Sequence, residues 1–288
     1  MQLQWDWLRP VVTVPYVPTL GPIHPATFGR ELFADVLAVA GTERFLPYDK
    51  DARWSEVKGE TVLPLAIDHG PGQTLIPTLS RRGAGTVKVH LYGDQPGGLA
   101  EAAELATKLA AEHGAGKARV VSFGAPGQPA RSGVACTRVQ FREFATERTT
   151  DQVGTVRPLE DQPAAVQATF PEFADKLSGD GFAFLHSRME LGGVGPVLVT
   201  VSDGRVSGAI GPMETMTDHA GQLRLLPQYF GVLPDFRGHR HGRALWRAAM
   251  RWGADHGAAY QLLQTEIDGA SDHLCRSEGL TDLGFVYS

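Results

Sequence analysis

The chain has 288 residues and a formal net charge of −5 at pH 7, from 27 basic and 32 acidic side chains. Hydrophobic residues make up 42% and charged residues 20%, a globular composition that excludes disordered, collagen-like and coiled-coil chains. The negative balance gives no general attraction for nucleic acid or anionic lipid, so any basic binding site has to be local. The length predicts two domains.

The cysteine content and the first residues indicate a compartment. Cys136 and Cys275 are too few for a disulfide framework and fit a reducing environment. Residues 1–10 contain tryptophan and aspartate where a secretory signal needs a basic and then an apolar stretch. No apolar run reaches the length of a membrane span. We therefore expect a cytoplasmic protein with no membrane partner.

The first half contains one clear strand, helix, strand unit. Residues 86–92 alternate between apolar and polar side chains, which predicts a half-buried strand. After a glycine-rich turn, the apolar residues between Leu99 and Ala110 fall on one helical face. A Gly-Ala-Gly stretch ends this helix, and residues 118–123 read as the next strand.

A polar segment separates the two halves. Residues 144–154 lack apolar periodicity, and we expect a domain boundary near Thr149, between domains of residues 1–148 and 149–288. The second domain then begins with a short strand from Thr155 and a helix over 162–177, capped by Asp161.

The next elements are a hairpin and a second strand, helix, strand unit. Residues 196–201 and 205–210 flank an Asp-Gly turn, a strong hairpin signal. Residues 223–232 predict a long strand, residues 245–252 a helix face, and residues 260–264 a further strand. The order repeats that of the first half. We favour a diverged internal duplication, although such units also recur by chance in unrelated folds.

The turn between the long strand and its helix carries the chemistry. It contains arginine, histidine and glycine, and no acidic residue occurs between Arg237 and Arg251. A helix start presents unpaired N–H groups, so a basic, glycine-containing turn there predicts an anion site. It is neither a P-loop nor a dinucleotide fingerprint. The alternative for Arg243, Arg247 and Arg251, which recur every fourth residue, is a solvated helix face.

These residues resemble a known family. Val232-Leu-Pro234, followed by Arg237-Gly-His-Arg-His-Gly242, is similar to the pyrophosphate loop of the GCN5-related N-acetyltransferase (GNAT) family, Gln/Arg-x-x-Gly-x-Gly/Ala after a strand ending in Val-x-Pro. Arg240 stands where the first motif glycine is expected. The resemblance covers residues 149–288, and residues 1–148 would be a degenerate copy, because their turn at 93–98 has no basic residue.

The resemblance implies an α/β (α+β) fold with a mixed, mostly antiparallel central sheet flanked by helices, in two related domains. It implies acetyl-CoA as cosubstrate and direct acyl transfer to the primary amine of a small molecule: an amino sugar, an amino acid or a secondary-metabolite intermediate. The N–H of Val232 would stabilise the oxyanion. The residues expected to bind the cofactor are Val232, Leu233, Arg237, Gly238, His239, Arg240, His241, Gly242 and Arg243.

The resemblance also points to an acid and a base. The family places a tyrosine in its last helix, and in residues 269–280 Cys275 occupies that position. A thiol could protonate the departing thiolate; the alternative is a small buried hydrophobic residue. Glu266, directly after the strand from Tyr260, is the candidate base. Asp268 is either a further candidate or a helix cap.

Other functions remain open at this point. The altered loop and the missing tyrosine are compatible with a non-catalytic CoA sensor, or with other chemistry on the same fold, such as decarboxylation of a malonyl thioester or aminoacyl transfer from tRNA. We expect no metal, since no His-x-x-x-His pair lies on a convincing helix, and no nucleic-acid partner. Both a monomer and a homodimer are compatible with the sequence.

Overall fold

The structure, a computed structural model, describes residues 3–128, 130–131, 133–144 and 156–288. The chain forms two compact units: residues 1–141 with 262–288 (unit 1), and residues 142–261 (unit 2). The expected boundary between residues 148 and 149 lies outside the described residues. The division into domains 1–148 and 149–288 stays a prediction, and residues 262–288 pack with unit 1.

Unit 1 is built on one sheet with strand order β15-β8-β16-β7-β6-β5-β3, and β4 pairs with β5. Pairs β5–β6, β16–β7 and β16–β8 are antiparallel, whereas β6–β7 is parallel. The strands are β3 (Glu60–Val62), β4 (Asp68–Gly70), β5 (Gln73–Ser80), β6 (Thr86–Gly93), β7 (Lys117–Gly124), β8 (Cys136–Glu143), β15 (Tyr260–Glu266) and β16 (Thr281–Tyr287). β15 passes from unit 2 to unit 1 after Gln261.

Strand β16 occupies a central position in this sheet. Phe285 pairs with Gly124 of β7 on one side and with Arg138 of β8 on the other. Strands β7 and β8 follow each other in the chain, so a strand from far along the sequence lies between them. Nothing in the local sequence pattern predicted this insertion.

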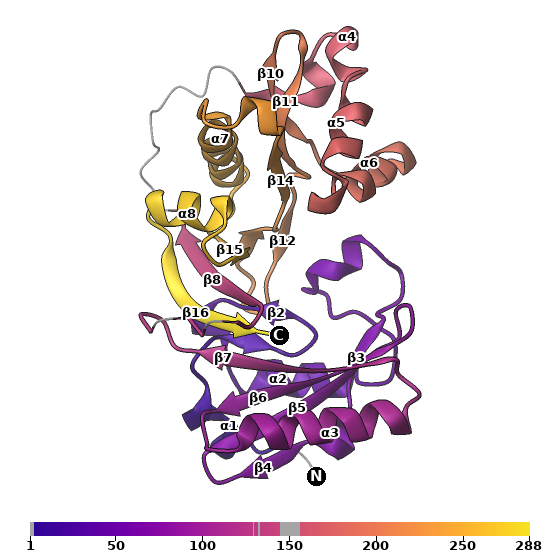
Figure 1. The fold of residues 1–288 in the computed structure, drawn as a ribbon, viewed down its shortest axis with the longest axis vertical. Coiled ribbons are helices and arrows are strands. Elements are labelled where there is room, and N and C mark those ends of the chain that lie inside the picture. Colours follow the sequence, from indigo (N-terminus) through magenta and orange to yellow (C-terminus); the bar gives the residue numbers. More distant parts are fainter. Residues whose placement is uncertain (1–2, 129, 132, 145–155) are drawn as a thin grey trace. The chain divides into compact units, whose positions relative to one another are not determined.

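The core of unit 1 lies between its sheet and helix α3 (Gly98–Glu112), which runs along one face (Figure 1). Leu75 of β5 and Leu91 of β6 pack against Ala102 and Ala106 of α3. On the opposite face, Tyr92 stacks on Phe123 with ring centroids 4.7 Å apart. The remaining elements of the unit are α1 (Trp5–Leu8), β1 (Tyr16–Val17), β2 (Gly21–Pro22), α2 (Arg30–Ala38) and α8 (Ala270–Ser277).

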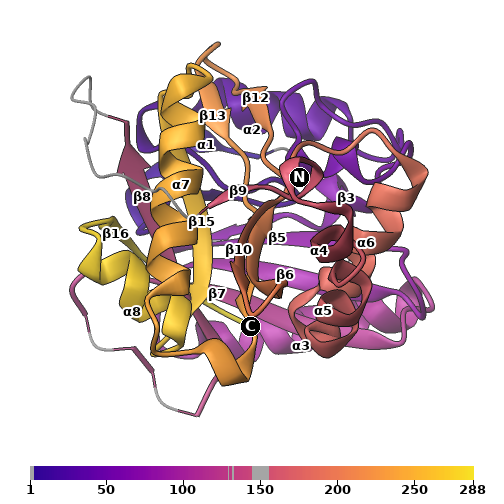
Figure 2. The same ribbon diagram turned by 90° about the horizontal axis from the view of Figure 1, so that it is seen from above.

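Unit 2 contains an antiparallel sheet of order β14-β11-β10-β9 with helices on both faces. Figure 2 shows α7 on one side of β10, and α4, α5 and α6 on the other. The bounds are β9 (Arg157–Pro158), α4 (Ala164–Gln167), α5 (Phe170–Lys176), α6 (Phe182–Leu191), β10 (Leu198–Ser202), β11 (Arg205–Gly211), β12 (Thr215–Thr217), β13 (Leu223–Leu225), β14 (Tyr229–Val232) and α7 (His241–Asp255).

The position of glycines in β11 and β14 shows how closely the layers of unit 2 pack. A Cβ at Gly208 would lie 2.9 Å from Leu245 of α7, and one at Gly231 would lie 2.9 Å from Leu177 and from Phe182 of α6. Both sheet faces are therefore covered at van der Waals distance, and the absence of a side chain permits the approach.

Two predicted elements are wrong. The helix expected over 162–177 is two helices, α4 and α5, and Asp161 lies in a preceding 3-10 turn and caps neither. Pro163 and Pro171 explain this, because proline favours the start of a helix and cannot donate within one. The strand expected over 223–232 is interrupted between β13 and β14, around Pro227. Proline has no backbone N–H and cannot donate a hydrogen bond to a neighbouring strand.

The other main predictions are confirmed. The two strand, helix, strand units are β6-α3-β7 and β13/β14-α7-β15, and both β6–β7 and β13–β15 pair in parallel. The hairpin of β10 and β11 turns at Asp203 and Gly204, with φ of 51° and 73°, as an Asp-Gly turn requires. The fold is mixed α/β, with a mostly antiparallel sheet flanked by helices.

Candidate functional site

The basic turn lies in unit 2, between β14 and α7. After Leu233 the chain forms a 3-10 turn, Pro234–Phe236, and reaches the helix through residues 237–240, all of them exposed. Gly238 and Arg240 are left-handed, with φ of 83° and 65°. Arg240 therefore adopts the conformation most accessible to glycine, at the position where the family motif has glycine.

The start of α7 offers unpaired donors. Its first backbone hydrogen bond runs from the N–H of Ala244 to the carbonyl of Arg240 at 3.0 Å, and no side chain caps it. Within the described chain, no N–H of residues 238–242 has a hydrogen-bond partner. The first turn also contains no acidic residue. Such a helix end attracts an anion.

The side chains of the turn add positive charge and tie it to the strand. Arg237 donates from Nε to the carbonyl of Val232 at 3.2 Å. The ring Nε2 of half-buried His241 lies 3.4 Å from Oγ of Ser202. Burial, and then the nearby His239, lower the pKa of His241. The lowered pKa reduces the share of charged imidazolium at His241, whereas the guanidinium groups of Arg237 and Arg240 keep their positive charge.

Val232 sits at the end of an edge strand. In the described chain, β14 has one strand neighbour, β11, with Gly208 opposite Val232. The N–H of Leu233 donates to the carbonyl of Ser207 at 3.0 Å. By the alternation of an antiparallel ladder, the N–H and carbonyl of Val232 therefore point away from β11. The carbonyl accepts from Arg237, and the N–H points to the same open side.

The interruption between β13 and β14 creates this open side. β13 pairs with the first two residues of β15, Leu225 opposite Gln261. Gln228, which follows Pro227, then accepts a hydrogen bond from Nε2 of the buried Gln261 at 2.7 Å. Beyond this contact β14 pairs with β11. The break that the sequence analysis missed thus frees one edge of the strand that carries Val232.

The predicted acid and base lie in unit 1, whereas Val232 and the basic turn lie in unit 2. Cys275 of α8 is 2% exposed. Burial, followed by the charges of Asp272 and Glu278, raises the pKa of its thiol to about 12. Glu266 is exposed at the end of β15. The two catalytic assignments stay predictions.

The sequence did not lead us to Asp272, a buried carboxylate beside Cys275. Asp272 is fully buried, and its Oδ1 accepts from Arg138 Nε at 2.8 Å, Gln140 Nε2 at 3.0 Å and Thr265 Oγ1 at 3.2 Å. Its Oδ2 accepts from the N–H of Asp268 at 3.3 Å, so Asp272 supports the helix start and Asp268 is no cap. The sequence feature that could have indicated this role is an acidic residue in the first turn of the last predicted helix.

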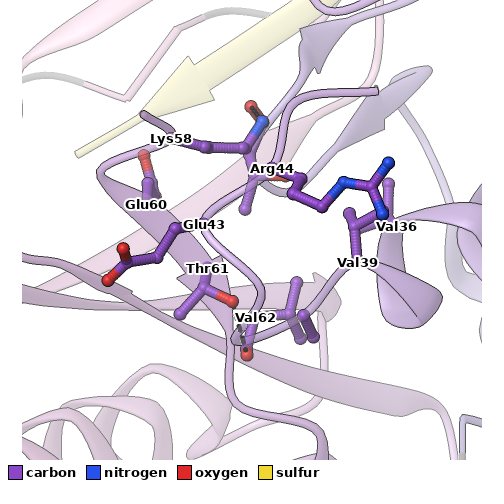
Figure 3. A pocket seen from close by; sticks show the side chains of 10 residues that line it. Val36, Val39, Glu43, Arg44, Lys58, Glu60, Thr61 and Val62 are labelled. Atoms are coloured by element: carbon purple, nitrogen blue, oxygen red, sulfur yellow. Dashed lines mark hydrogen bonds between the residues drawn. The ribbon is translucent and has the colours of Figure 1, made fainter. Parts of the chain in front are cut away.

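Unit 1 also contains a small pocket between α2 and β3 (Figure 3), with about 220 Å³ of space including the solvent at its mouth. Three of its four charged side chains are engaged: Lys58 pairs with buried Asp49, Glu43 accepts from Arg81 at 2.7 Å, and Glu60 pairs with Lys88 at 3.1 Å. None of the predicted site residues lines it. We assign it no role in the reaction.

The described residues contain neither a metal-binding cluster nor a membrane-spanning helix. No group of three or more histidine, cysteine, aspartate or glutamate side chains is placed to hold a metal ion. No helix has the length and apolarity needed to cross a bilayer.

Comparison with known proteins gives structural similarities only. No family model and no curated protein matches the sequence. A GCN5-related N-acetyltransferase from Sphaerobacter thermophilus is 13% identical, with a TM-score of 0.47 over 88% of this chain and 91% of that one. A tandem GNAT protein of the clavulanic acid biosynthesis pathway is 16% identical, with a TM-score of 0.41 over 75% and 78%.

A third similar structure, a GCN5-related N-acetyltransferase from Kribbella flavida, is 13% identical, with a TM-score of 0.45 over 77% of this chain and 88% of that one. Because all three TM-scores are below 0.5, these structures carry no argument about function. The function of this chain has to be argued from the geometry of its own loop and strand.

Proposed function

We propose that the chain is an acyl-CoA-dependent N-acyltransferase that transfers an acetyl group from acetyl-CoA directly to the primary amine of a small molecule. The observation that carries the proposal is the combination of two features in unit 2. Residues 238–242 present N–H groups at a basic helix start, and these groups have no hydrogen-bond partner among the residues that the structure describes. The N–H of Val232, at the end of the preceding strand, points off the edge of β14.

The residues of the turn fit the charged part of acetyl-CoA. The N–H groups of residues 238–242, with Arg237 and Arg243, would hold its pyrophosphate, because unpaired N–H groups and guanidinium groups both favour phosphate oxygens. When bound, the cosubstrate supplies the activated acyl group. The N–H of Val232 would donate to the carbonyl oxygen of that group and stabilise the negative charge developing there.

The proton transfers are proposed for two residues of unit 1. Glu266 would accept a proton from the ammonium form of the substrate, and Cys275 would donate one to the departing thiolate. Replacing Cys275 by alanine should then lower kcat about 100-fold and leave the Kd for CoA unchanged. Cys275→Ser is the matched control for packing. A kcat within threefold of wild type in the alanine variant would exclude Cys275 as the acid.

The binding proposal is tested by calorimetry with CoA, acetyl-CoA and pantetheine, which lacks the pyrophosphate. CoA and acetyl-CoA should bind and stabilise the fold, by about 2.7 kcal/mol at a concentration of 100 times Kd. Pantetheine should bind far more weakly. Free thiol should appear when acetyl-CoA and an accepted amine are both present. No heat and no stabilisation with millimolar CoA would refute the proposal.

A CoA-binding module without catalysis is the second candidate, and Cys275 favours it. A thiol whose pKa is raised to about 12 is a weak proton donor toward a thiolate of ordinary basicity. A non-catalytic CoA-binding module would bind CoA in the same calorimetric experiment, but it would release no thiol from acetyl-CoA with any member of a broad amine panel.

A further inference from the structure

A chain of hydroxyl groups connects the start of α7 to the hairpin of β10 and β11. His241 is the first residue of α7, and its Nε2 lies 3.4 Å from Oγ of Ser202. Oγ of Ser202 lies 3.4 Å from Oγ of Ser207, which in turn lies 3.1 Å from Oγ1 of Thr200. Oγ1 of Thr200 is 3.5 Å from the carbonyl oxygen of Gly208. Three hydroxyl groups thus link the basic turn to the interior of unit 2.

A β-bulge in the hairpin places the middle hydroxyl group. Val206 pairs with Val201, and Gly208 pairs with Thr200. Ser207 is therefore an extra residue of β11, and no residue of β10 lies opposite it in the described hairpin. A bulge of this kind redirects a side chain, and bulges are frequent beside functional sites. Because Ser207 and Thr200 are buried, their hydroxyl groups depend on the chain for their hydrogen bonds.

The direction of the hydrogen bonds follows from the last member of the chain. A carbonyl oxygen only accepts, so Thr200 donates its single hydroxyl hydrogen to Gly208. Thr200 then accepts from Ser207, and Ser207 accepts from Ser202. Because Ser202 has donated its own hydrogen, it accepts from His241, and Nε2 of His241 carries a hydrogen. Nδ1 is therefore the ring nitrogen that gains and loses a proton.

Nδ1 of His241 lies on the side of the ring that belongs to the helix start. It is bonded to Cγ and is thus the ring nitrogen nearer to the backbone of the residue, whereas Nε2 points to the hairpin. Among the described residues, Nδ1 has no hydrogen-bond partner. A proton on Nδ1 adds one donor and one positive charge beside the N–H groups of residues 238–242, and it leaves the bond from Nε2 to Ser202 intact.

The groups around the His241 ring determine when that proton binds. The rings of His239 and Phe236 lie 6.4 Å and 6.3 Å away, and the hairpin contributes the hydroxyl group of Ser202. Burial and then His239 lower the pKa of His241, which favours the unprotonated form in the free protein. A bound anion acts in the opposite direction. The other charged side chains of these segments are Asp203, Arg205, Asp235, Arg237, Arg240 and Arg243.

We propose that binding of CoA takes up a proton from solvent at Nδ1 of His241, and that Ser202, Ser207 and Thr200 are positioning residues that hold the ring in the required tautomer. The inference rests on the proposed function, because that function supplies the pyrophosphate as the ligand of the turn. The negative charge of the pyrophosphate beside Nδ1 favours the imidazolium form. The affinity gained is fully present below the pKa of His241 in the free protein, and it is lost as the pH rises through the higher pKa in the complex.

The tautomer is tested in the protein without ligand, by nitrogen-15 NMR of the histidine rings. The signals of His241 are identified by their loss in His241→Gln. Above the pKa of His241, wild type should carry a hydrogen on Nε2 and none on Nδ1. Ser202→Ala should give a mixture of both tautomers, whereas Ser202→Thr, which keeps the hydroxyl group, should preserve the Nε2–H form. A hydrogen on Nδ1 in wild type would overturn the proposal.

Proton uptake is tested by calorimetry with dephospho-CoA, which keeps the pyrophosphate but lacks the phosphate monoester, a group that itself titrates at about pH 6. Titrations in buffers of different ionisation enthalpy give the number of protons taken up. Wild type should take up protons and bind about 10-fold more tightly at about pH 6 than at about pH 8. In His241→Gln the Kd should change less than about twofold over this range.

Two controls separate this effect from folding and from other histidines. His256→Gln, at the opposite end of α7, should keep the pH dependence of wild type. Thermal unfolding at both pH values shows whether each variant is folded, and His241→Ala takes the place of His241→Gln if the latter does not fold. If the pH dependence disappears in His239→Gln and persists in His241→Gln, the neighbouring histidine is responsible and the inference is wrong.

The outcomes distinguish this inference from the proposed function. If wild type binds dephospho-CoA with the same Kd at both pH values, or without taking up protons, the inference is wrong and the proposed binding of CoA stands. If wild type binds neither CoA nor dephospho-CoA, the proposed function fails and the inference fails with it.

Discussion

Arg240 allows the geometry of the turn to be tested by stability alone. Its φ of 65° is left-handed, which costs a residue with a Cβ about 1–2 kcal/mol. Glycine adopts this conformation without that cost but loses about 0.4–1 kcal/mol more conformational entropy on folding. Both Arg240→Gly and Arg240→Ala remove the guanidinium. We therefore expect the glycine variant to be more stable than the alanine variant by about 0.5–1 kcal/mol.

Urea unfolding of the two variants measures this difference directly, because the exposed guanidinium is absent from both. In CoA titrations both variants should bind more weakly than wild type, and by similar factors, since each has lost the same charge. An alanine variant as stable as the glycine variant would show that residue 240 is not left-handed in solution. The explanation given for glycine at this motif position would then be wrong.

Three further predictions follow from contacts described above. Arg237→Ala should weaken CoA binding by about 1.5–3 kcal/mol in calorimetry, since it loses a charge-assisted phosphate contact; an unchanged Kd would contradict the placement of the turn. Asp272→Ala should lower the free energy of unfolding in urea by about 3–5 kcal/mol, because it breaks a buried ion pair with Arg138, whereas a loss below 1 kcal/mol would refute this network. Burial lowers the pKa of His90 to about 4, so the unfolded state binds a proton first as the pH falls. Stability should drop by about 3 kcal/mol between pH 6.5 and 4 in wild type, and His90→Gln should lack this part of the drop.

The sequence was informative where structure is local. Alternation in β6 and the apolar face of α3 arise from residues two to four positions apart, and both elements were predicted close to their bounds. The Asp-Gly hairpin and the basic turn at Arg237 have local signatures as well. These features could be predicted because neighbouring residues decide them.

What could not be predicted depends on residues distant in the chain. The insertion of β16 between β7 and β8 is a choice of partner strand, which no local pattern specifies. The partners of Asp272 come from β8 and β15, so its position in the first turn of α8 could indicate a helix start but not the burial of the side chain. The interruption of 223–232 was missed because its apolar alternation outweighed a single proline.

The position of β16 has a consequence for the order of synthesis. On the ribosome, β8 emerges with neither of its neighbours, because β15 begins only at Tyr260, at the end of unit 2, and β16 follows it. A nascent chain that stalls before residue 262 exposes both edges of β8, and unpaired edges promote aggregation. Completion of unit 1 is therefore a late event, and shortened versions of this gene that end within unit 2 should yield insoluble protein.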